Sequence, residues 1–292
     1  MKKECIFIDV FTDVPYAGNQ LAVFPNGEGL TGGQMQKLAQ EINYSESVFI
    51  LPGDKAGADF ELRIFTIATE LPFAGHPVLG TAYSILNILD MWAEKKDALR
   101  LKTKAGVIRL ERRGENIWMT QNEPQFFKQH KDTSEIAGLV SLLPEDIAED
   151  LPVVEVSTGN NILIVPVKSL AAMQRAKGNM NRMQDFFRRN DAMAPYLFTR
   201  ETVNRNAAVH TRLLAAHMGI PEDAATGSAA GPLTAYLLKY NLFGSKFSIE
   251  NEQGLEMGRP SKILMGGEIK DAKYIIKVGG ACAYAGRGEF II

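Results

Sequence analysis

The sequence lacks the cysteine and histidine patterns that hold disulfide-rich or zinc-binding domains together. Only two of its 292 residues are cysteines, Cys5 and Cys282, and they lie at opposite ends of the chain. Neither belongs to a C-x-x-C pair, so neither a disulfide framework nor a zinc site is expected. The four histidines show no H-E-x-x-H spacing, so we expect no metal site.

A large excess of one charge and long apolar runs are also missing. The net charge is −2, so there is no basic surplus to attract nucleic acid or an anionic membrane surface. No apolar run is long enough to span a bilayer, and Glu4 and Asp9 interrupt the apolar segment that a signal peptide needs. We therefore expect a soluble, cytoplasmic protein with no nucleic-acid or membrane partner.

Signatures for binding phosphate groups are absent as well. No G-x-x-x-x-G-K-[ST] loop occurs, and no G-x-G-x-x-G follows the first strand-like run. These absences remove the usual signs of a nucleotide cofactor, so we expect the protein to use no cofactor. Acid–base chemistry by side chains on a small acid is the function class that remains.

What the chain does contain is one pattern of elements used twice. In each half, strand-like runs lead through a glycine-containing turn into a long apolar helix, and further strands follow. We expect an α+β fold of two similar halves, 1–122 and 123–280, with a final strand in 281–292 that returns to the N-terminal half. Residues 123–150 are polar, and we interpret them as a connection with short helices.

Two glycine-containing turns stand at the starts of the predicted long helices. Gly75-His76-Pro77 opens a helix predicted over about 77–92, and Thr226-Gly227-Ser228 opens one over about 228–240. Small residues at a helix start leave backbone N–H groups uncovered, and the positive end of the helix dipole adds to their attraction for anions. We therefore expect a small anionic ligand to be held between the two halves.

Four side chains are candidates for proton transfer, and three of them stand at these turns. His76 carries the side chain most often used for that purpose, although a histidine at a helix start also serves as a plain hydrogen bonder. Asp223 and Ser228 flank the second turn, where each serves equally well as a helix cap, and no G-x-S-x-G elbow surrounds Ser228. Glu46 lies between two serines where a helix meets a strand, and partial burial there would raise its pKa.

At these residues the chain resembles the phenazine-biosynthesis PhzF-like family, within the diaminopimelate epimerase-like superfamily. The likeness lies in five segments that follow one another in the family's order. They are Val10–Phe24, Asn43–Phe49, Glu70–His76, Glu222–Gly231 and Gln253–Ser261. The fourth segment is close to the family's most specific signature, and the fifth matches its C-terminal motif.

The resemblance implies two β-roll-like halves, each wrapped around a central helix, and a cofactor-independent isomerase that moves a proton on a small carboxylated metabolite. It assigns Glu46 as the main acid/base, with His76, Asp223 and Ser228 assisting. It also implies that the substrate binds at Gly75, His76, Thr226, Gly227 and Ser228. A homodimer is the implied assembly.

Some positions depart from the family's pattern. Pro77-Val78 stands where the family usually has Ala-Thr, and Ala224 replaces a usual proline. Ala74 and Ala225 match the positions where racemases of the superfamily carry two catalytic thiols, so a two-thiol racemase is not expected. A non-thiol racemase or epimerase remains an alternative, as does a non-catalytic small-acid binding or interaction protein that retains the fold.

Overall fold

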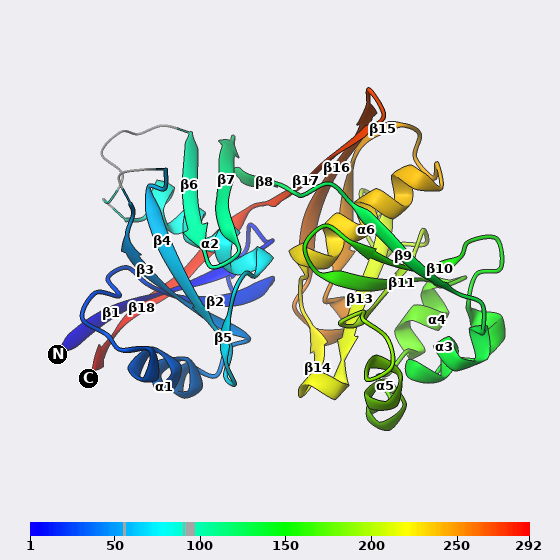
Figure 1. Ribbon diagram of the computed structural model, residues 1–292, viewed down its shortest axis with the longest axis horizontal. Coiled ribbons are helices and arrows are strands. Elements are labelled where there is room, and N and C mark those ends of the chain that lie inside the picture. Colours follow the sequence, from blue (N-terminus) through cyan, green and yellow to red (C-terminus); the bar gives the residue numbers. More distant parts are fainter. Residues whose placement is uncertain (55–56, 90, 92–96) are drawn as a thin grey trace. The chain divides into compact units, whose positions relative to one another are not determined.

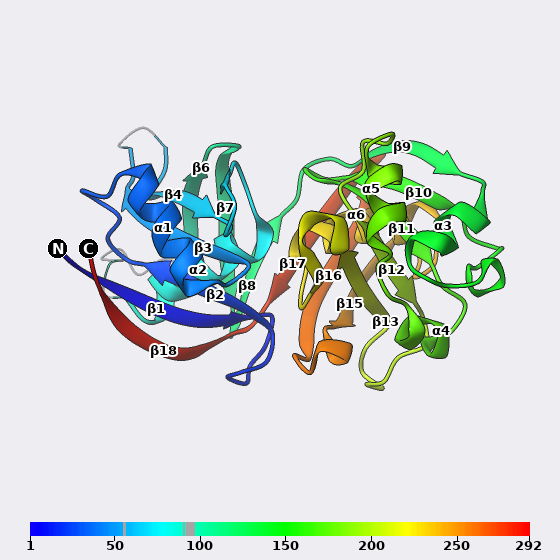
Figure 2. The ribbon, with the colours of Figure 1, turned by 90° about the horizontal axis from the view of Figure 1, so that it is seen from below.

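The computed structural model describes residues 1–54, 57–89, 91 and 97–292, and the chain divides into two compact units. Unit 1 comprises Met1–Thr120 and Gly279–Ile292, and unit 2 comprises Gln121–Val278. The first strand, β1 (Lys2–Val10), pairs antiparallel with the last, β18 (Cys282–Ile291). Both ends of the chain therefore lie side by side in unit 1 (Figure 2).

Unit 1 is a set of strands arranged around one central helix, α2 (Gly75–Asn87) (Figure 1). Its other elements are β2 (Asn19–Phe24), α1 (Gly32–Ile42), β3 (Glu46–Pro52), β4 (Phe60–Phe65), β5 (Glu70–Leu71), β6 (Ala98–Thr103), β7 (Gly106–Arg113) and β8 (Asn116–Thr120). The pairs β2–β3 and β4–β6 are parallel, and the others are antiparallel. Parallel neighbours need a crossover connection, and α1 and α2 lie in those crossovers.

Unit 2 surrounds its own central helix, α6 (Gly227–Lys239) (Figure 1). Its strands are β9 (Gln125–His130), β10 (Val153–Ser157), β11 (Asn161–Pro166), β12 (Pro195–Thr199), β13 (Val209–Ala215), β14 (Ile220–Asp223), β15 (Lys246–Gln253), β16 (Ser261–Lys270) and β17 (Lys273–Gly280). Its other helices are α3 (Thr133–Leu139), α4 (Leu170–Arg175), α5 (Met180–Phe187) and three short 3₁₀ turns, Pro144–Asp146, Ala216–Met218 and Leu255–Met257.

The order of strand pairing in unit 2 repeats that of unit 1. The parallel pairs β11–β12 and β13–β15 correspond to β2–β3 and β4–β6, and each set is flanked by antiparallel pairs. At the outer edge, β9 pairs with β10 as β18 pairs with β1. The predicted α+β class, with two similar β-roll-like halves around central helices, is confirmed.

The central helix of unit 1 approaches the surrounding strands closely because it carries Gly80. A Cβ atom at this position would lie 2.6 Å from Leu21 Cδ2 and 2.7 Å from Val10 Cγ2, well inside normal contact. The glycine therefore lets α2 lie directly against β1 and β2. Most of the helix is buried around its whole circumference, as its almost entirely apolar sequence predicts.

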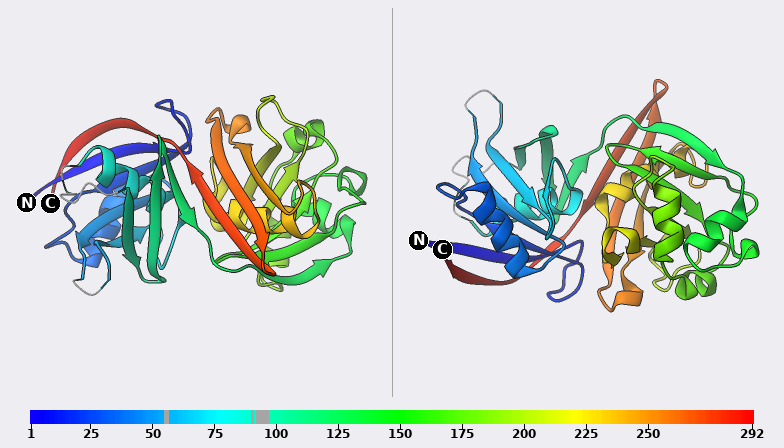
Figure 3. Two further views of the ribbon diagram at one scale, coloured as in Figure 1. Left: turned by 90° about the horizontal axis from the view of Figure 1, so that it is seen from above. Right: turned by 60° about the horizontal axis from the view of Figure 1, so that its bottom comes forward.

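The smaller helices cover the outer faces of the sheets. In unit 2, α3, α4 and α5 pack over a second apolar cluster that includes Leu163, Leu197 and Phe186 (green helices in Figure 3). In unit 1, α1 packs on a smaller cluster around Phe24 and Phe49. Among the described residues no helix has both the length and the apolar character needed to cross a membrane.

The helix predicted over 77–92 differs from α2 at both ends. It begins at Gly75, so Pro77 occupies the third helical position, where its missing N–H leaves no intrahelical hydrogen bond unmade. It ends at Asn87, and the segment 92–96 lies outside the described residues. The second predicted helix, 228–240, differs from α6 by one residue at each end.

Three strands of unit 2 were not predicted. β9 lies in the segment 123–150, which we interpreted as a connection. The strand could not be recognised in the sequence because its side chains are mostly exposed and show no alternation. β12 is buried at all five positions, so it also lacks the two-residue period that reveals a half-buried strand. β14 has only four residues, too few for a strand pattern to show in the sequence.

Candidate active site

Unit 1 brings Glu46 and His76 together. Glu46 is the first residue of β3, and the chain reaches it from Asn43, which caps α1 in the left-handed conformation. His76 is the second residue of α2. Glu46 Oε2 lies 3.5 Å from His76 Nε2, and the two side chains are 16% and 6% exposed. The partial burial predicted for Glu46 is therefore present.

The environment of Glu46 favours the protonated carboxyl. Burial raises the pKa of Glu46 above its ordinary value, while a hydrogen bond with Ser45 opposes the rise. Atom Oε2 of Glu46 is buried and accepts no hydrogen bond from any described residue. A carboxyl with a raised pKa exchanges protons closer to neutral pH, which suits a general acid/base.

His76 is held through its other ring nitrogen. Asn19 Nδ2 lies 3.3 Å from His76 Nδ1, and Ser45 Oγ donates to Asn19 Oδ1 at 3.4 Å. With the Asn19 amide donating to Nδ1, the neutral ring carries its proton on Nε2, the atom that faces Glu46. His76 is thereby oriented to donate a hydrogen bond towards the Glu46 carboxylate.

The chain enters α2 through a short strand fixed by an ion pair. Glu70 in β5 accepts two hydrogen bonds from Arg63 in β4, both at 2.8 Å, and this pairing lowers the pKa of Glu70 to about 2. The N-cap residue of the helix is Ala74, whose methyl group cannot accept a hydrogen bond. The ion pair thus holds β5 against β4 just before the chain reaches Gly75 and His76. These two residues begin a helix that has no side-chain cap.

Unit 2 brings Asp223 and Thr226 together at the start of α6. Asp223 is the last residue of β14, and Thr226 is the N-cap residue of the helix. Thr226 Oγ1 donates to Asp223 Oδ2 at 2.5 Å, and the threonine side chain makes no capping bond to the helix. Gly227 and Ser228 are the first two helical residues, the former buried and the latter half-buried. This helix start also lacks a side-chain cap.

An arginine–glutamate ion pair precedes α6 as well, and the sequence did not reveal it. Arg212 Nε and Nη2 donate to Glu222 at 2.8 and 2.6 Å, while Nη1 donates to the carbonyls of Met173 and Ala176. The pairing of β13 with β14 brings the two charges together, and that pairing was not predicted. A glutamate a few residues before each turn was the available signal.

Comparison with known proteins assigns the family. The chain matches the family described as phenazine biosynthesis-like protein, PhzC-PhzF, over residues 8–288. The chain belongs to this family. Among its relatives in the PhzF family, the trans-2,3-dihydro-3-hydroxyanthranilate isomerase of Pseudomonas aeruginosa is 34% identical over 261 residues, which cover 88% of both proteins.

Solved structures agree with that assignment. A phenazine biosynthesis protein of the PhzF family from Bacillus anthracis superposes with a TM-score of 0.92 at 29% identity, covering 100% of both chains. A hydroxyproline epimerase from Agrobacterium vitis, 12% identical with a TM-score of 0.67, covers 99% of this chain and 91% of its own, and shows a shared fold alone. The predicted PhzF-like isomerase with a diaminopimelate epimerase-like fold is confirmed.

Neither thiol of this PhzF-family chain stands at the residues that precede the two helix starts. Ala74 and Ala225 immediately precede the glycine-containing turns, whereas Cys5 lies in β1 and Cys282 in β18. Burial raises the pKa of Cys5 to about 12 and also raises the pKa of Cys282. Because a thiol acts as a base only as the thiolate, neither cysteine is suited to take a proton from a substrate.

Proposed function

We propose that this chain isomerises a small carboxylated metabolite without a cofactor, with Glu46 moving the proton. The observation that carries the proposal is the state of the Glu46 carboxyl. Burial raises its pKa, Oε2 accepts no hydrogen bond from any described residue, and His76 Nε2 lies 3.5 Å away. A group with these properties can take a proton from carbon and return it near neutral pH.

In the proposed reaction, ionised Glu46 removes a proton from one carbon of the substrate. The electron pair of the broken C–H bond forms a new double bond to the neighbouring carbon. The electron pair of the existing double bond moves to the far carbon of that bond, where protonated Glu46 returns the proton. No atom is gained or lost, so neither an oxidant nor a reductant is needed. His76 Nε2–H, which lies 3.5 Å from Glu46 Oε2, would donate to the carboxylate once Glu46 is ionised.

We assign substrate binding to the two helix starts. Backbone N–H groups at Gly75-His76 and at Gly227-Ser228, together with the helix dipoles, would hold a carboxylate. Thr226 and the hydroxyl of Ser228 would contribute to the same binding, and Asp223 would assist proton transfer. The missing side-chain caps at Ala74 and Thr226 support this assignment, because a capping side chain would occupy the same N–H groups.

The substrate named for the Pseudomonas aeruginosa relative, trans-2,3-dihydro-3-hydroxyanthranilate, is the first acid to test. The test is solvent deuterium uptake in D2O, followed by mass spectrometry. We expect Glu46→Gln to reduce uptake by roughly 10²- to 10⁴-fold, the usual contribution of a general acid/base. The acid should still raise the thermal stability of this variant, because the amide keeps the shape of the side chain.

The matched control is Glu41→Gln, the same change on the exposed surface of α1. This control should exchange deuterium at the wild-type rate. A Glu46→Gln variant with wild-type uptake would sink the proposed mechanism.

The same assay distinguishes the two alternatives. A non-catalytic binder would be stabilised by small acids and yet would incorporate no deuterium into them. A non-thiol racemase or epimerase would place deuterium at one carbon and yield both configurations there. A positional isomerase instead leaves the label at a carbon different from the one that lost its proton.

We further propose that the protein acts as a homodimer in the cytoplasm. The dimer is expected from the family resemblance and from the frequency of symmetric pairs among soluble oligomers. Sedimentation velocity would test the assembly, and a monomer at micromolar concentration would reject the dimer. Fractionation of cells that express the chain would test the location.

A further inference from the structure

The C-terminal motif at Gln253–Ser261 has no part in the proton transfer proposed above, yet it contacts the turn that carries Asp223. Gln253 ends β15 and is fully buried. Its Nε2 donates to the carbonyl of Asp223 at 2.9 Å and to Thr226 Oγ1 at 3.0 Å, and its Oε1 accepts from Thr226 N at 3.2 Å. One side-chain amide therefore joins both ends of the turn.

Backbone groups fix which way the Gln253 amide points. The N–H of Thr226 can only donate, so the amide oxygen must face it. The carbonyl of Asp223 can only accept, so the amide nitrogen must face that side. Rotating the amide by 180° would set donor against donor and acceptor against acceptor in a site from which water is excluded.

The orientation of the amide determines the hydrogen bond of Thr226. Its hydroxyl has one hydrogen, and it already accepts a bond from Gln253 Nε2. The hydrogen is therefore directed to Asp223 Oδ2, which lies 2.5 Å away. The Thr226 side chain, which bonds with Asp223 and Gln253, makes no capping bond to α6.

Buried polar groups support Gln253 from behind. Tyr196 Oη lies 2.8 Å from Gln253 Oε1, and Asn251 Nδ2 donates to Tyr196 Oη at 3.0 Å. Thr211 Oγ1 lies 2.8 Å from Asn251 Oδ1. All four residues are fully buried, so the amide of Gln253 has little freedom to move.

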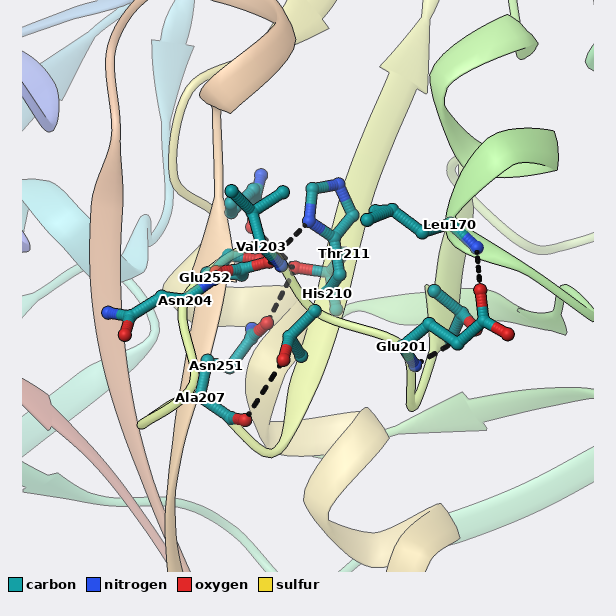
Figure 4. A network of polar contacts seen from close by, with 12 residues as sticks. Leu170, Glu201, Val203, Asn204, Ala207, His210, Thr211, Asn251 and Glu252 are labelled. Atoms are coloured by element: carbon teal, nitrogen blue, oxygen red, sulfur yellow. Dashed lines mark hydrogen bonds and ion pairs between the residues drawn. The ribbon is translucent and has the colours of Figure 1, made fainter.

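The opposite face of the same strands carries further polar contacts, which join those behind Gln253 where Thr211 Oγ1 donates to the carbonyl of Glu252 at 3.3 Å. His210 pairs with Glu252 at 2.8 Å, and Glu252 also accepts from the backbone of Val203 and Asn204 (Figure 4). Because side chains alternate along a strand, Glu252 faces away from Gln253. This ion pair anchors the end of β15 on the face opposite Gln253.

The rest of the motif holds the middle of the turn. Gly254 has a positive φ of 77°, and a Cβ atom there would lie 2.5 Å from the carbonyl oxygen of Ala224. Ser261 Oγ donates to the same carbonyl at 3.0 Å. Gln253 thus contacts Asp223 and Thr226 at the two ends of the turn, and Gly254 and Ser261 both lie against the carbonyl of Ala224 between them.

We propose that Gln253 is a positioning residue for Asp223, acting through the hydroxyl of Thr226. We call the three hydrogen-bonded residues Asp223, Thr226 and Gln253 the Gln253 clamp. The clamp fixes the Asp223 carboxyl and keeps the start of α6 open for a substrate carboxylate. This inference rests on the proposed function only for the role that it gives to Asp223.

The clamp itself can be tested without any substrate. Hydrogen exchange of the side-chain amide of Gln253, followed by NMR, should be slow in the wild-type protein. Thr226→Val removes one of the two acceptors of that amide, so one of its two protons should exchange about 10-fold faster, corresponding to the loss of one buried hydrogen bond. Unprotected protons in the wild type, or an unchanged rate in Thr226→Val, would overturn the clamp.

The positioning role is tested by Gln253→Glu in the deuterium assay. An ionised carboxylate at 253 cannot donate, so it would draw the Thr226 hydroxyl away from Asp223. A buried carboxyl keeps its proton to higher pH than an exposed one, and the protonated form restores one donor. We expect kcat to fall about 10-fold at pH 8, with KM changed less than 3-fold, and the deficit to shrink as the pH is lowered.

The matched control is Gln36→Glu, where a half-buried amide on α1 donates to the carbonyl of Thr66 at 2.8 Å. Its activity relative to wild type should not vary with pH. A deficit in Gln253→Glu that is independent of pH, or that lies wholly in KM, would refute the positioning role. A wild-type protein that exchanges no proton would refute the proposed reaction, whereas the amide-exchange experiment would still decide the clamp.

Discussion

In both units an arginine bridges to a glutamate on the short strand that precedes the central helix. Arg63 pairs with Glu70 in unit 1, and Arg212 pairs with Glu222 in unit 2. Each arginine donates from Nε and from Nη2, so both bridges are bidentate. The two units therefore use the same ion pair to place a glycine-containing turn at the start of a buried helix.

The units differ at the neighbouring position of that short strand. Strand register pairs Ile64 with Leu71 in unit 1 and Leu213 with Asp223 in unit 2. Leu71 and Asp223 thus occupy corresponding positions, one residue after the bridging glutamate. A carboxylate stands before the helix in unit 2, where unit 1 has an apolar side chain.

The first parallel strand pair of each unit, β2–β3 in unit 1 and β11–β12 in unit 2, differs in the opposite sense: here the carboxylate belongs to unit 1. Leu21 pairs with Glu46 in unit 1, and Leu163 pairs with Pro195 in unit 2. The position that carries the proposed acid/base in unit 1 is occupied in unit 2 by a proline, a residue whose side chain has no titratable group. The repeated framework therefore provides two similar helix starts, while each unit carries its carboxylate on a different strand.

The largest expected effect in this comparison is the loss of stability when one of the two arginine–glutamate bridges is broken. Arg212 is 6% exposed and Arg63 is 26% exposed. Glu222→Gln leaves a buried guanidinium poorly compensated and should reduce the free energy of unfolding by about 3–5 kcal/mol. Glu70→Gln leaves a partly solvated one and should cost about 1 kcal/mol or less. Urea denaturation of the two variants measures both losses of unfolding free energy. Equal losses would contradict the expectation that the more buried bridge contributes more to stability.

The bridges also show what the sequence could and could not reveal. The bounds of helix α1 follow from local signals in the sequence: Thr31 and Gln34 form a capping box, and Asn43 ends the helix in the left-handed conformation. The bridges and the Gln253 clamp join residues on different strands. Their partners follow from strand register, and local patterns do not reveal register where strands are buried on both faces.

The candidate residues divide in the same way. His76 was found by its place beside a glycine turn, Glu46 by its place between two serines where a helix meets a strand, and both by resemblance. Their 3.5 Å approach, however, needs β3 and α2 to be packed together. Asn19, which orients His76, stood in a matching segment without an assigned role. Gln253 was part of a recognised motif, and only the fold shows what its amide contacts.

The second-largest effect contrasts the second residue of each central helix. His76→Asn removes the group that faces Glu46 and should lower the rate of deuterium exchange by roughly 10²-fold. Ser228→Ala removes one hydroxyl and should change it less than about 10-fold, mainly through KM. Steady-state kinetics in D2O measures both. The control His217→Asn, on a partly exposed histidine of unit 2, should retain full activity. Equal losses at His76 and Ser228 would break the assignment of proton transfer to unit 1.

The smallest effect is on stability and depends on pH. The folded-state pKa of Glu46 lies above its ordinary value of 4.5, so the unfolded chain gives up this proton first as the pH rises. The wild type therefore loses stability relative to Glu46→Gln as the pH rises from about 4.5 to the folded-state pKa. The loss amounts to about 1.4 kcal/mol for each pH unit by which the folded-state pKa exceeds the ordinary value. Thermal unfolding of both proteins between pH 4 and pH 8 measures it. A difference that does not vary with pH would contradict the burial of this carboxyl.

The account depends most directly on the protonation of Glu46 in the folded protein. NMR of protein labelled with ¹³C at the glutamate side-chain carboxyl can follow that group, with Glu46→Gln identifying its signal. We predict that Glu46 titrates above its ordinary value of 4.5, and that the same pKa appears as the acidic limb of kcat/KM for deuterium exchange. Titration at or below 4.5, or an acidic limb that survives in Glu46→Gln, would contradict the assignment of Glu46 as the acid/base.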